Sequence, residues 1–132
     1  MKPLEGITVL EFSTMITASF AAMMMAEQGA KVIKVEPMNV GDPMRYIGAN
    51  KGGISSLFAN CNRGKQSIRV NLKEAAGQAL IREMVPEVDV FIHNFRPGVM
   101  DKLNLGSEAL RELNPRLIYA AISGFGKEGP LG

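Results

Sequence analysis

The side chains best suited to chemistry in this sequence lie in the short run Asn94-Phe95-Arg96-Pro97-Gly98. An Arg guanidinium holds a phosphate group through two parallel hydrogen bonds, and a Phe ring covers a purine base or an apolar arm. The Pro-Gly pair favours a turn that would keep the amide, the ring and the guanidinium together. This run therefore predicts a binding site for a ligand that carries phosphate.

Further cations precede this run in the chain. Arg63 and Lys65 stand in Asn62-Arg63-Gly64-Lys65, and Lys73 lies near the expected start of a helix, where backbone N–H groups attract anions. Lysine and arginine are also the usual residues of a solvated surface, and Pro-Gly is a common structural turn. By spacing alone, a phosphate site and a set of ordinary surface charges both stay open.

The familiar nucleotide-binding motifs do not apply here. The stretch 124–129 matches G-x-G-x-x-G and follows a predicted strand, but Pro130 comes directly after it, where the motif needs a helix to begin. The first strand-to-helix connection, 13–19, contains no glycine, and Gly64-Lys65 lacks the first glycine of a Walker A motif. These patterns argue against a nicotinamide or flavin site and against a P-loop.

The single histidine and the single cysteine are interpreted as structural. His93 follows a predicted strand without any G-x-S-x-G elbow in the sequence, so we expect a hydrogen-bonded histidine rather than a member of a Ser-His-Asp triad. Cys61 has no partner for an intrachain disulfide or a cysteine metal cage. We therefore expect a buried, unreactive thiol in a reducing compartment.

The elements that must position these side chains alternate between strands and helices. Apolar, β-branched runs predict strands over 8–12, 31–36, 67–70, 88–92 and 117–122. Helical spacing and capping patterns predict helices over 20–28, from an Asn71 cap to 85, over 99–103, and over 107–113 with Ser107 as the cap. Between 37 and 66, glycines and prolines predict a loop with one helical turn near 55–58.

This alternation predicts an α/β fold with a mostly parallel sheet and helices on both faces. Ligands of such sheets gather at the carboxyl ends of the strands. Here the connections 13–18, 71–73 and 94–98 follow strand ends, as do the loops that begin at 37 and at 123. The run at 94–98 therefore falls where a ligand is expected.

Composition sets the remaining bounds. The chain has 132 residues, of which 46% are hydrophobic and 21% charged, as in a soluble globular domain. A net charge of only +2 argues against a dedicated nucleic-acid-binding protein. The start of the chain lacks the apolar run of a signal peptide, and no stretch is apolar for long enough to span a membrane. We expect a cytoplasmic protein without nucleic-acid or membrane partners.

Several motifs, in order along the whole chain, carry a resemblance to a known family. They are Lys2–Ile7, Gly29–Pro37, Gly41-Asp42, Asn62–Lys65, Asn94–Gly98, and Leu113–Tyr119 followed by Ser123–Gly126. Together they resemble the family III coenzyme A transferases, which include formyl-CoA and carnitine-CoA transferases and the α-methylacyl-CoA racemases. The resemblance implies a Rossmann-like large domain, a smaller second domain, and a homodimer whose chains interlock.

The resemblance also implies which residues bind coenzyme A, without any metal ion. The matching positions are Ile16, Thr17, Val70, Asn71, Leu72, Lys73, Asn94, Phe95, Arg96 and Lys102. Three positions depart from the family pattern. Thr17-Ala18-Ser19 stands where many members have Ala-Gly-Pro, Pro37 stands where some transferases have a phosphate-binding Arg, and Lys102 replaces a frequent Arg.

By resemblance, the activity is transfer of coenzyme A from an acyl-CoA to a carboxylic acid through an aspartyl-CoA intermediate. Two alternatives stay open: an α-methylacyl-CoA racemase, and a non-catalytic fragment that binds coenzyme A. In the family, the catalytic Asp lies beyond the Ser-Gly-Phe-Gly loop. We therefore expect residues 1–132 to form the N-terminal part of the coenzyme A-binding domain and to be inactive alone, with no catalytic residue of their own.

Overall fold

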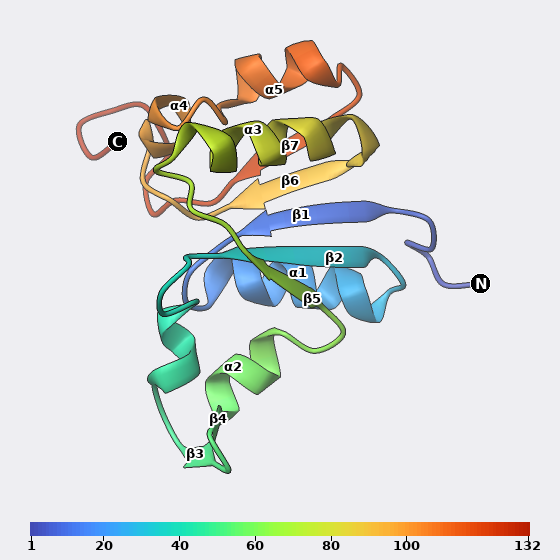
Figure 1. The fold of residues 1–132 in the computed structure, drawn as a ribbon, viewed down its shortest axis with the longest axis vertical. Helices are drawn as coiled ribbons and strands as arrows, with labels where there is room; N and C mark the ends of the chain where they lie inside the picture. The colour runs from blue at the N-terminus through green and yellow to red at the C-terminus, as the bar shows by residue number, and fades with distance from the viewer.

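Five parallel strands form the centre of the protein, whose computed structural model describes residues 1–132. They are β1 (Thr8–Phe12), β2 (Lys31–Glu36), β5 (Gln66–Arg69), β6 (Val90–His93) and β7 (Ile118–Ala121). Their order in the sheet is β5-β2-β1-β6-β7, so the chain builds outward from β1 first on one side and then on the other (Figure 1). The α/β fold with a parallel sheet is confirmed, and the reversal of winding falls between β1 and β6.

Helices cover both faces of the sheet. Side chains of a strand alternate between the two faces, and both faces carry apolar side chains that must be buried. Val9 and Ile92 belong to the cluster that packs under α1 (Thr17–Glu27). Leu10 and Phe91 belong to a larger cluster under three helices of the opposite face. These helices are α3 (Ala75–Met84), α4 (Val99–Lys102) and α5 (Ser107–Leu113), which Figure 1 shows above the sheet.

Aromatic rings lock the three strands beside the reversal point. The rings of Phe12 and Phe91 stack with centroids 4.5 Å apart, and Phe91 stacks on Tyr119 at 5.0 Å. The stack runs across β1, β6 and β7 on the α3 face. Because such rings bury a large apolar area at a defined spacing, they hold these three strand ends in a fixed relation.

The stretch between β2 and β5 is more regular than the sequence predicted. A 3₁₀ helix, η1 (Pro43–Tyr46), is followed by a hairpin of β3 (Asn50–Lys51) and β4 (Ile54–Ser55) and by α2 (Ser56–Cys61). The helical turn expected near 55–58 is the start of α2, whereas the 3₁₀ helix and the hairpin were not predicted. Side-chain caps cause the difference: Asp42 accepts a hydrogen bond from the Met44 N–H, and Ser55 accepts one from the Phe58 N–H.

Two helices begin at other residues than predicted. α1 starts at Thr17 rather than at residue 20, and α3 starts at Ala75 because Glu74, not Asn71, is its N-cap. The Asn71 side chain accepts from the Lys73 N–H at 3.1 Å and donates to the Glu74 carboxylate at 2.9 Å. It thereby holds a turn before the helix instead of capping it.

Other helices and strands begin or end within one or two residues of their predicted bounds. Gly106 rather than Ser107 caps α5, and a 3₁₀ turn, η2 (Val85–Glu87), contains the proline predicted to end the preceding helix. The strands β5, β6 and β7 differ from their predicted bounds by one or two residues. None of the helices combines the length and the apolar character needed to cross a membrane.

Gly77 provides a stability test of the connection between β5 and α3. A Cβ atom there would lie 2.0 Å from the Asn71 carbonyl oxygen, which belongs to the backbone and has little freedom to move. We predict that Gly77→Ala lowers the free energy of unfolding by about 1–3 kcal/mol, although alanine is the better helix former. Urea denaturation followed by circular dichroism measures the change.

Gly124→Ala is the matched control, because no atom lies within 4 Å of a Cβ at that position. It should change the free energy of unfolding by no more than about 0.5 kcal/mol. Equal free energies of unfolding for the two variants would show that the Asn71 carbonyl does not pack closely against Gly77 of α3.

Candidate functional site

The first connection, Ser13 to Ile16, is held at the carboxyl edge by a side chain from the neighbouring strand end. Asn94, directly after β6, accepts a hydrogen bond from the Thr14 N–H at 3.1 Å. Its amide nitrogen donates to the Thr14 carbonyl at 2.7 Å and to the Thr17 hydroxyl at 3.0 Å. The Asn94 amide therefore joins the loop after β1 to the loop after β6, and its polar atoms already have protein partners.

Residues Met15 to Thr17 form the exposed part of this connection. Met15 has a φ of 63°, a left-handed conformation that is unfavourable for a residue with a side chain. Ile16 is the N-cap of α1 but contributes no side-chain cap, so the first backbone N–H groups of the helix have no internal acceptor. Ile16 and Thr17 thus lie where an anion is attracted, at the start of an 11-residue helix.

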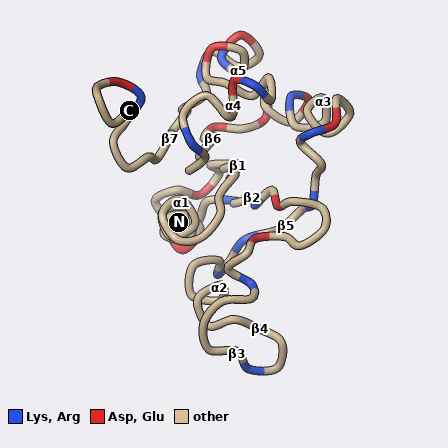
Figure 2. The backbone as a smooth tube through the Cα atoms, turned by 90° about the vertical axis from the view of Figure 1, so that its left-hand side faces the viewer, with Lys and Arg blue, Asp and Glu red and all other residues tan.

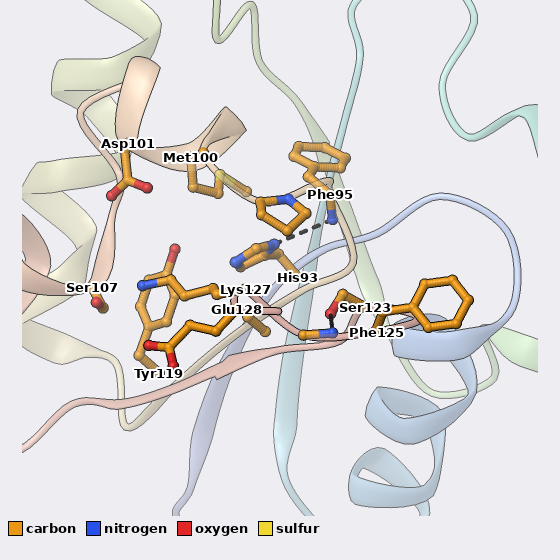
Figure 3. A pocket seen from close by; sticks show the side chains of 14 residues that line it. His93, Phe95, Met100, Asp101, Ser107, Tyr119, Ser123, Phe125, Lys127 and Glu128 are labelled. Carbon is orange, nitrogen blue, oxygen red and sulfur yellow. Dashed lines mark hydrogen bonds between the residues drawn. The ribbon is translucent and has the colours of Figure 1, made fainter. Parts of the chain in front are cut away.

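His93 is buried and hydrogen-bonded, as predicted. The Phe95 N–H donates to His93 Nδ1 at 3.2 Å, so a neutral ring carries its proton on Nε2. Burial lowers the pKa of His93, and the Asp101 carboxylate opposes this only in part. The ring lies between Phe95 and Tyr119 (Figure 3) and supports the Phe95 loop from below.

Two cavities open beside this loop. One, of about 520 Å³, is lined by His93, Asp101, Ser107 and Tyr119 together with residues 123 and 125–128 (Figure 3). Tyr119 donates its hydroxyl proton to the Leu105 carbonyl at 3.0 Å, and burial raises its pKa above its usual range. The other cavity, of about 480 Å³, is lined by residues 94–97 on one side and 122–126 on the other.

Three cations at this edge have no protein partner. Lys73, Arg96 and Lys102 are exposed, and no ion pair or side-chain hydrogen bond involves them. Arg96 lies against the 480 Å³ cavity. Unpartnered cations beside a half-buried Phe95 are suited to a ligand that carries negative charge.

The other two cations of the sequence hypothesis have different partners. Arg63 donates to the Glu27 carboxylate at 2.7 Å, and Lys65 lies 2.6 Å from a Glu11 carboxylate oxygen with its side chain 2% exposed. Burial lowers the pKa of Lys65, against the opposing effect of Glu11. Lys65 therefore serves the fold and is too buried to meet a phosphate, whereas Arg63 forms a half-exposed ion pair and its contact with a phosphate stays a prediction.

The connection after β5 crosses the carboxyl edge on its way to α3 (Figure 1). Val70 is buried, and Leu72 packs against the same core cluster as Phe95. The turn at Asn71 leaves Lys73 exposed beside them. Figure 2, which faces this edge, shows α1 on one side of the sheet and the helices α3, α4 and α5 on the other.

The structure thus brings the predicted residues to one edge in separate groups. Thr17 and Asn94 are hydrogen-bonded to each other, Leu72 and Phe95 share a core cluster, and Lys102 lies on α4. Their contacts with a ligand stay predictions. No three His, Cys, Asp or Glu side chains gather in a way that would hold a metal ion.

Sequence reasoning missed the buried carboxylates behind this edge. Glu36 is fully buried and accepts from Arg45 Nε at 2.8 Å, from Ser67 Oγ at 2.6 Å and from the Asp42 N–H at 2.7 Å. Burial alone raises the pKa of Glu36, but the hydrogen bonds from these partners outweigh burial and lower it to about 2. The only signal in the sequence was an acidic residue at the end of a strand rich in β-branched residues.

The fold is a Rossmann-like α/β sheet with helices on both faces, and exposed, unpaired cations lie at the carboxyl ends of its strands, the edge at which ligands of such sheets bind. Comparison with known proteins narrows the class. The family model described as CoA-transferase family III matches residues 4–132. The chain belongs to this family.

Curated relatives and solved structures agree with this assignment. The chain is 44% identical over 129 residues to an acetyl-CoA:oxalate CoA-transferase of Acetobacter aceti, covering 98% of this chain and 33% of the relative. It is 39% identical to a human succinyl-CoA:glutarate CoA-transferase, covering 99% of this chain and 30% of the relative. The chain therefore spans about a third of the length of the curated relatives it matches.

The crystal structure of a CaiB/BaiF family protein from Brucella suis superposes with a TM-score of 0.91 at 39% identity. The match covers 98% of this chain and 35% of the Brucella chain. A protein from Mycobacterium tuberculosis superposes with a TM-score of 0.92 at 37% identity, covering 99% of this chain and 37% of that chain. The parallel sheet and its helices are therefore those of the family.

The low pKa of Glu36 predicts acid sensitivity. A carboxylate whose folded pKa is lowered from 4.5 to about 2 stabilises the fold fully above pH 4.5, and this stabilisation is lost as the pH falls through about 2. In Glu36→Gln this contribution is absent. The difference in free energy of unfolding between wild type and Glu36→Gln should therefore shrink as the pH falls, as measured by urea denaturation.

Arg45→Ala tests the cause of the shift. Removing this donor should raise the pKa of Glu36 and move the acid-induced loss of stability to higher pH. If the free energies of unfolding of the wild type and Glu36→Gln differ by the same amount at pH 4.5 and at pH 2, the hydrogen-bonded carboxylate described above is contradicted.

Proposed function

We propose that this chain binds coenzyme A at the carboxyl edge of its sheet. The observation that carries the proposal is the trio of exposed, unpartnered cations, Lys73, Arg96 and Lys102, on segments that follow β5 and β6 in a member of CoA-transferase family III. Coenzyme A carries phosphates on one half and an apolar, flexible arm on the other. A cationic edge with one aromatic ring suits both halves.

Arg96 takes the leading role in this proposal. Its guanidinium is exposed beside a cavity of about 480 Å³, and a guanidinium binds phosphate through paired hydrogen bonds. Lys73 and Lys102 act as point charges for the remaining phosphates. Phe95 packs against the apolar arm while its own backbone is fixed by His93.

The connections that frame the edge complete the proposed site. Ile16 and Thr17 present the open backbone N–H groups at the start of α1, and Val70, Asn71 and Leu72 bring the chain across the edge. Asn94 holds Thr14 and Thr17 in place, so its contribution to binding is indirect. These residues together form the coenzyme A-binding part of the domain.

For the whole protein we propose transfer of coenzyme A from an acyl-CoA to a carboxylic acid. The curated relatives are named as acetyl-CoA:oxalate and succinyl-CoA:glutarate transferases, both of which pair an acyl-CoA with a dicarboxylic acid. An aspartate attacks the thioester carbonyl and expels the coenzyme A thiolate, which leaves a mixed anhydride. The thiolate then attacks the aspartyl carbonyl, releases the donor carboxylate and forms an aspartyl thioester. The acceptor carboxylate attacks this thioester, which gives a second mixed anhydride and frees the thiolate. The thiolate finally attacks the acceptor's carbonyl, forms the new acyl-CoA and releases the aspartate.

Two of the three aspartates in this chain are already bound within the fold. Asp42 is fully buried against Lys34, and Asp89 accepts from the Thr8 N–H at 2.9 Å at the amino end of the sheet. We assign the nucleophile to neither of them. The homodimer and the cytoplasmic location implied by the resemblance stay predictions.

Replacement of Arg96 tests the proposed site. Loss of a charge-assisted hydrogen bond to phosphate should weaken coenzyme A binding by Arg96→Ala about ten- to a hundredfold, measured by isothermal titration calorimetry. Arg116→Ala is the matched control, because Arg116 is an exposed arginine that precedes β7 at the opposite edge of the sheet. It should leave the affinity unchanged.

Pantetheine separates the phosphate contacts from the rest of the site. This ligand lacks the nucleotide phosphates, so Arg96→Ala should bind pantetheine with the same affinity as the wild type does. Undiminished binding of coenzyme A by Arg96→Ala would remove Arg96 from the site, and absence of binding by the wild-type chain would refute the proposed function.

A further inference from the structure

Four charged side chains are buried together beneath the first connection, and we call them the buried charge cluster: Glu11, Lys34, Asp42 and Lys65. Lys34 Nζ lies 2.8 Å from Glu11 Oε1 and 2.9 Å from Asp42 Oδ2. Lys65 Nζ lies 2.6 Å from Glu11 Oε2. None of the four side chains is more than 2% exposed, and two negative charges balance two positive ones.

The cluster ties together segments that are distant in the sequence. Glu11 on β1 and Lys34 on β2 are direct neighbours in the parallel register and point to the α1 face. Lys34 Nζ also donates to Ser13 Oγ at 3.0 Å and to Ser19 Oγ at 3.1 Å, on either side of the first connection. Lys65 Nζ donates to the Ser19 carbonyl at 2.8 Å.

Burying paired charges contributes little net free energy to the stability of a fold. The loss of hydration of each ion opposes the attraction between the ions, and well-packed apolar residues often serve as well. A cluster of this kind does impose one geometry, because each ion must meet its partners.

Asp42 connects the cluster to the ligand edge. While its Oδ2 pairs with Lys34, its Oδ1 accepts from the Met15 N–H at 3.2 Å and from the Met44 N–H at 2.9 Å. Met15 is one of only two non-glycine residues with positive φ, at 63°. Its unfavourable conformation sets the direction in which Ile16 and Thr17 leave the sheet.

We propose that Asp42, oriented by Lys34, is a positioning residue for coenzyme A: it holds Met15 in the left-handed conformation and so directs the start of α1 toward the ligand. The inference rests on the proposed function of the same edge. Asp42 lies behind the first connection and is fully buried, so it acts through Met15 and not by contact with the ligand.

The alternative is that Asp42 only braces the segment between β2 and β5. Three variants separate the two roles. Asp42→Ala removes the acceptor and the charge, Asp42→Ala with Met15→Gly lets residue 15 adopt positive φ without steric cost, and Arg45→Ala weakens the same segment through Glu36 without touching Met15. Each variant is first checked for folding by urea denaturation.

Coenzyme A affinity is then measured by calorimetry on the folded variants. Asp42→Ala should bind about five- to thirtyfold more weakly, the cost of a left-handed residue that is no longer held. The double variant should recover at least half of that loss on a logarithmic scale. Arg45→Ala should bind as the wild type does.

A readout without ligand keeps the inference separate from the proposed function. The Met15 three-bond HN–Hα coupling and Cα chemical shift report its φ, and Asp42→Ala should abolish their left-handed values. If the wild type fails to bind coenzyme A, the proposed function is wrong, and the role of Asp42 is still judged by these values. Retention of the left-handed values in Asp42→Ala, equal weakening by Arg45→Ala, or no rescue by Met15→Gly would each overturn the inference.

Discussion

The path of the chain around the first connection depends on one constraint: charged side chains that are buried must stay paired. Lys34 on β2 meets Glu11 on β1 and Asp42 from the following segment, and removing one partner of such a pair costs about 3–5 kcal/mol. The segment between β2 and β5 must therefore return to the sheet at Asp42 and again at Lys65. The first connection and the start of α1 lie between these attachments.

The parallel sheet gives this arrangement its functional consequence. Because all five strands run the same way, the loops after β1, β5, β6 and β7 meet at one edge. The buried cations Lys34 and Lys65 pair internally behind that edge, whereas Lys73, Arg96 and Lys102 remain exposed on it. The fold thus separates structural charges from exposed charges, and the exposed ones lie where we propose that coenzyme A binds.

Local patterns in the sequence were enough for the architecture. Apolar, β-branched runs located the strands that carry Leu10 and Phe91, two residues of the larger core cluster. The Asn94-Phe95-Arg96 run was placed correctly after a buried strand, since strand ends are marked by nearby turn residues. The family motifs, being continuous short segments, were also legible without any structure.

Sequence alone therefore determined the order of the elements, the parallel α/β fold and the edge at which a ligand is expected. Only the tertiary structure decided which polar side chains are free to meet a ligand. Lys34 pairs with Glu11 across 23 residues, and Asn94 holds Thr14 across 80. Periodicity describes neighbours a few positions apart, but a charge buried in the fold takes whichever partner the crossing chain brings within about 3 Å. That pairing is a property of the packed chain, and no local pattern specifies it.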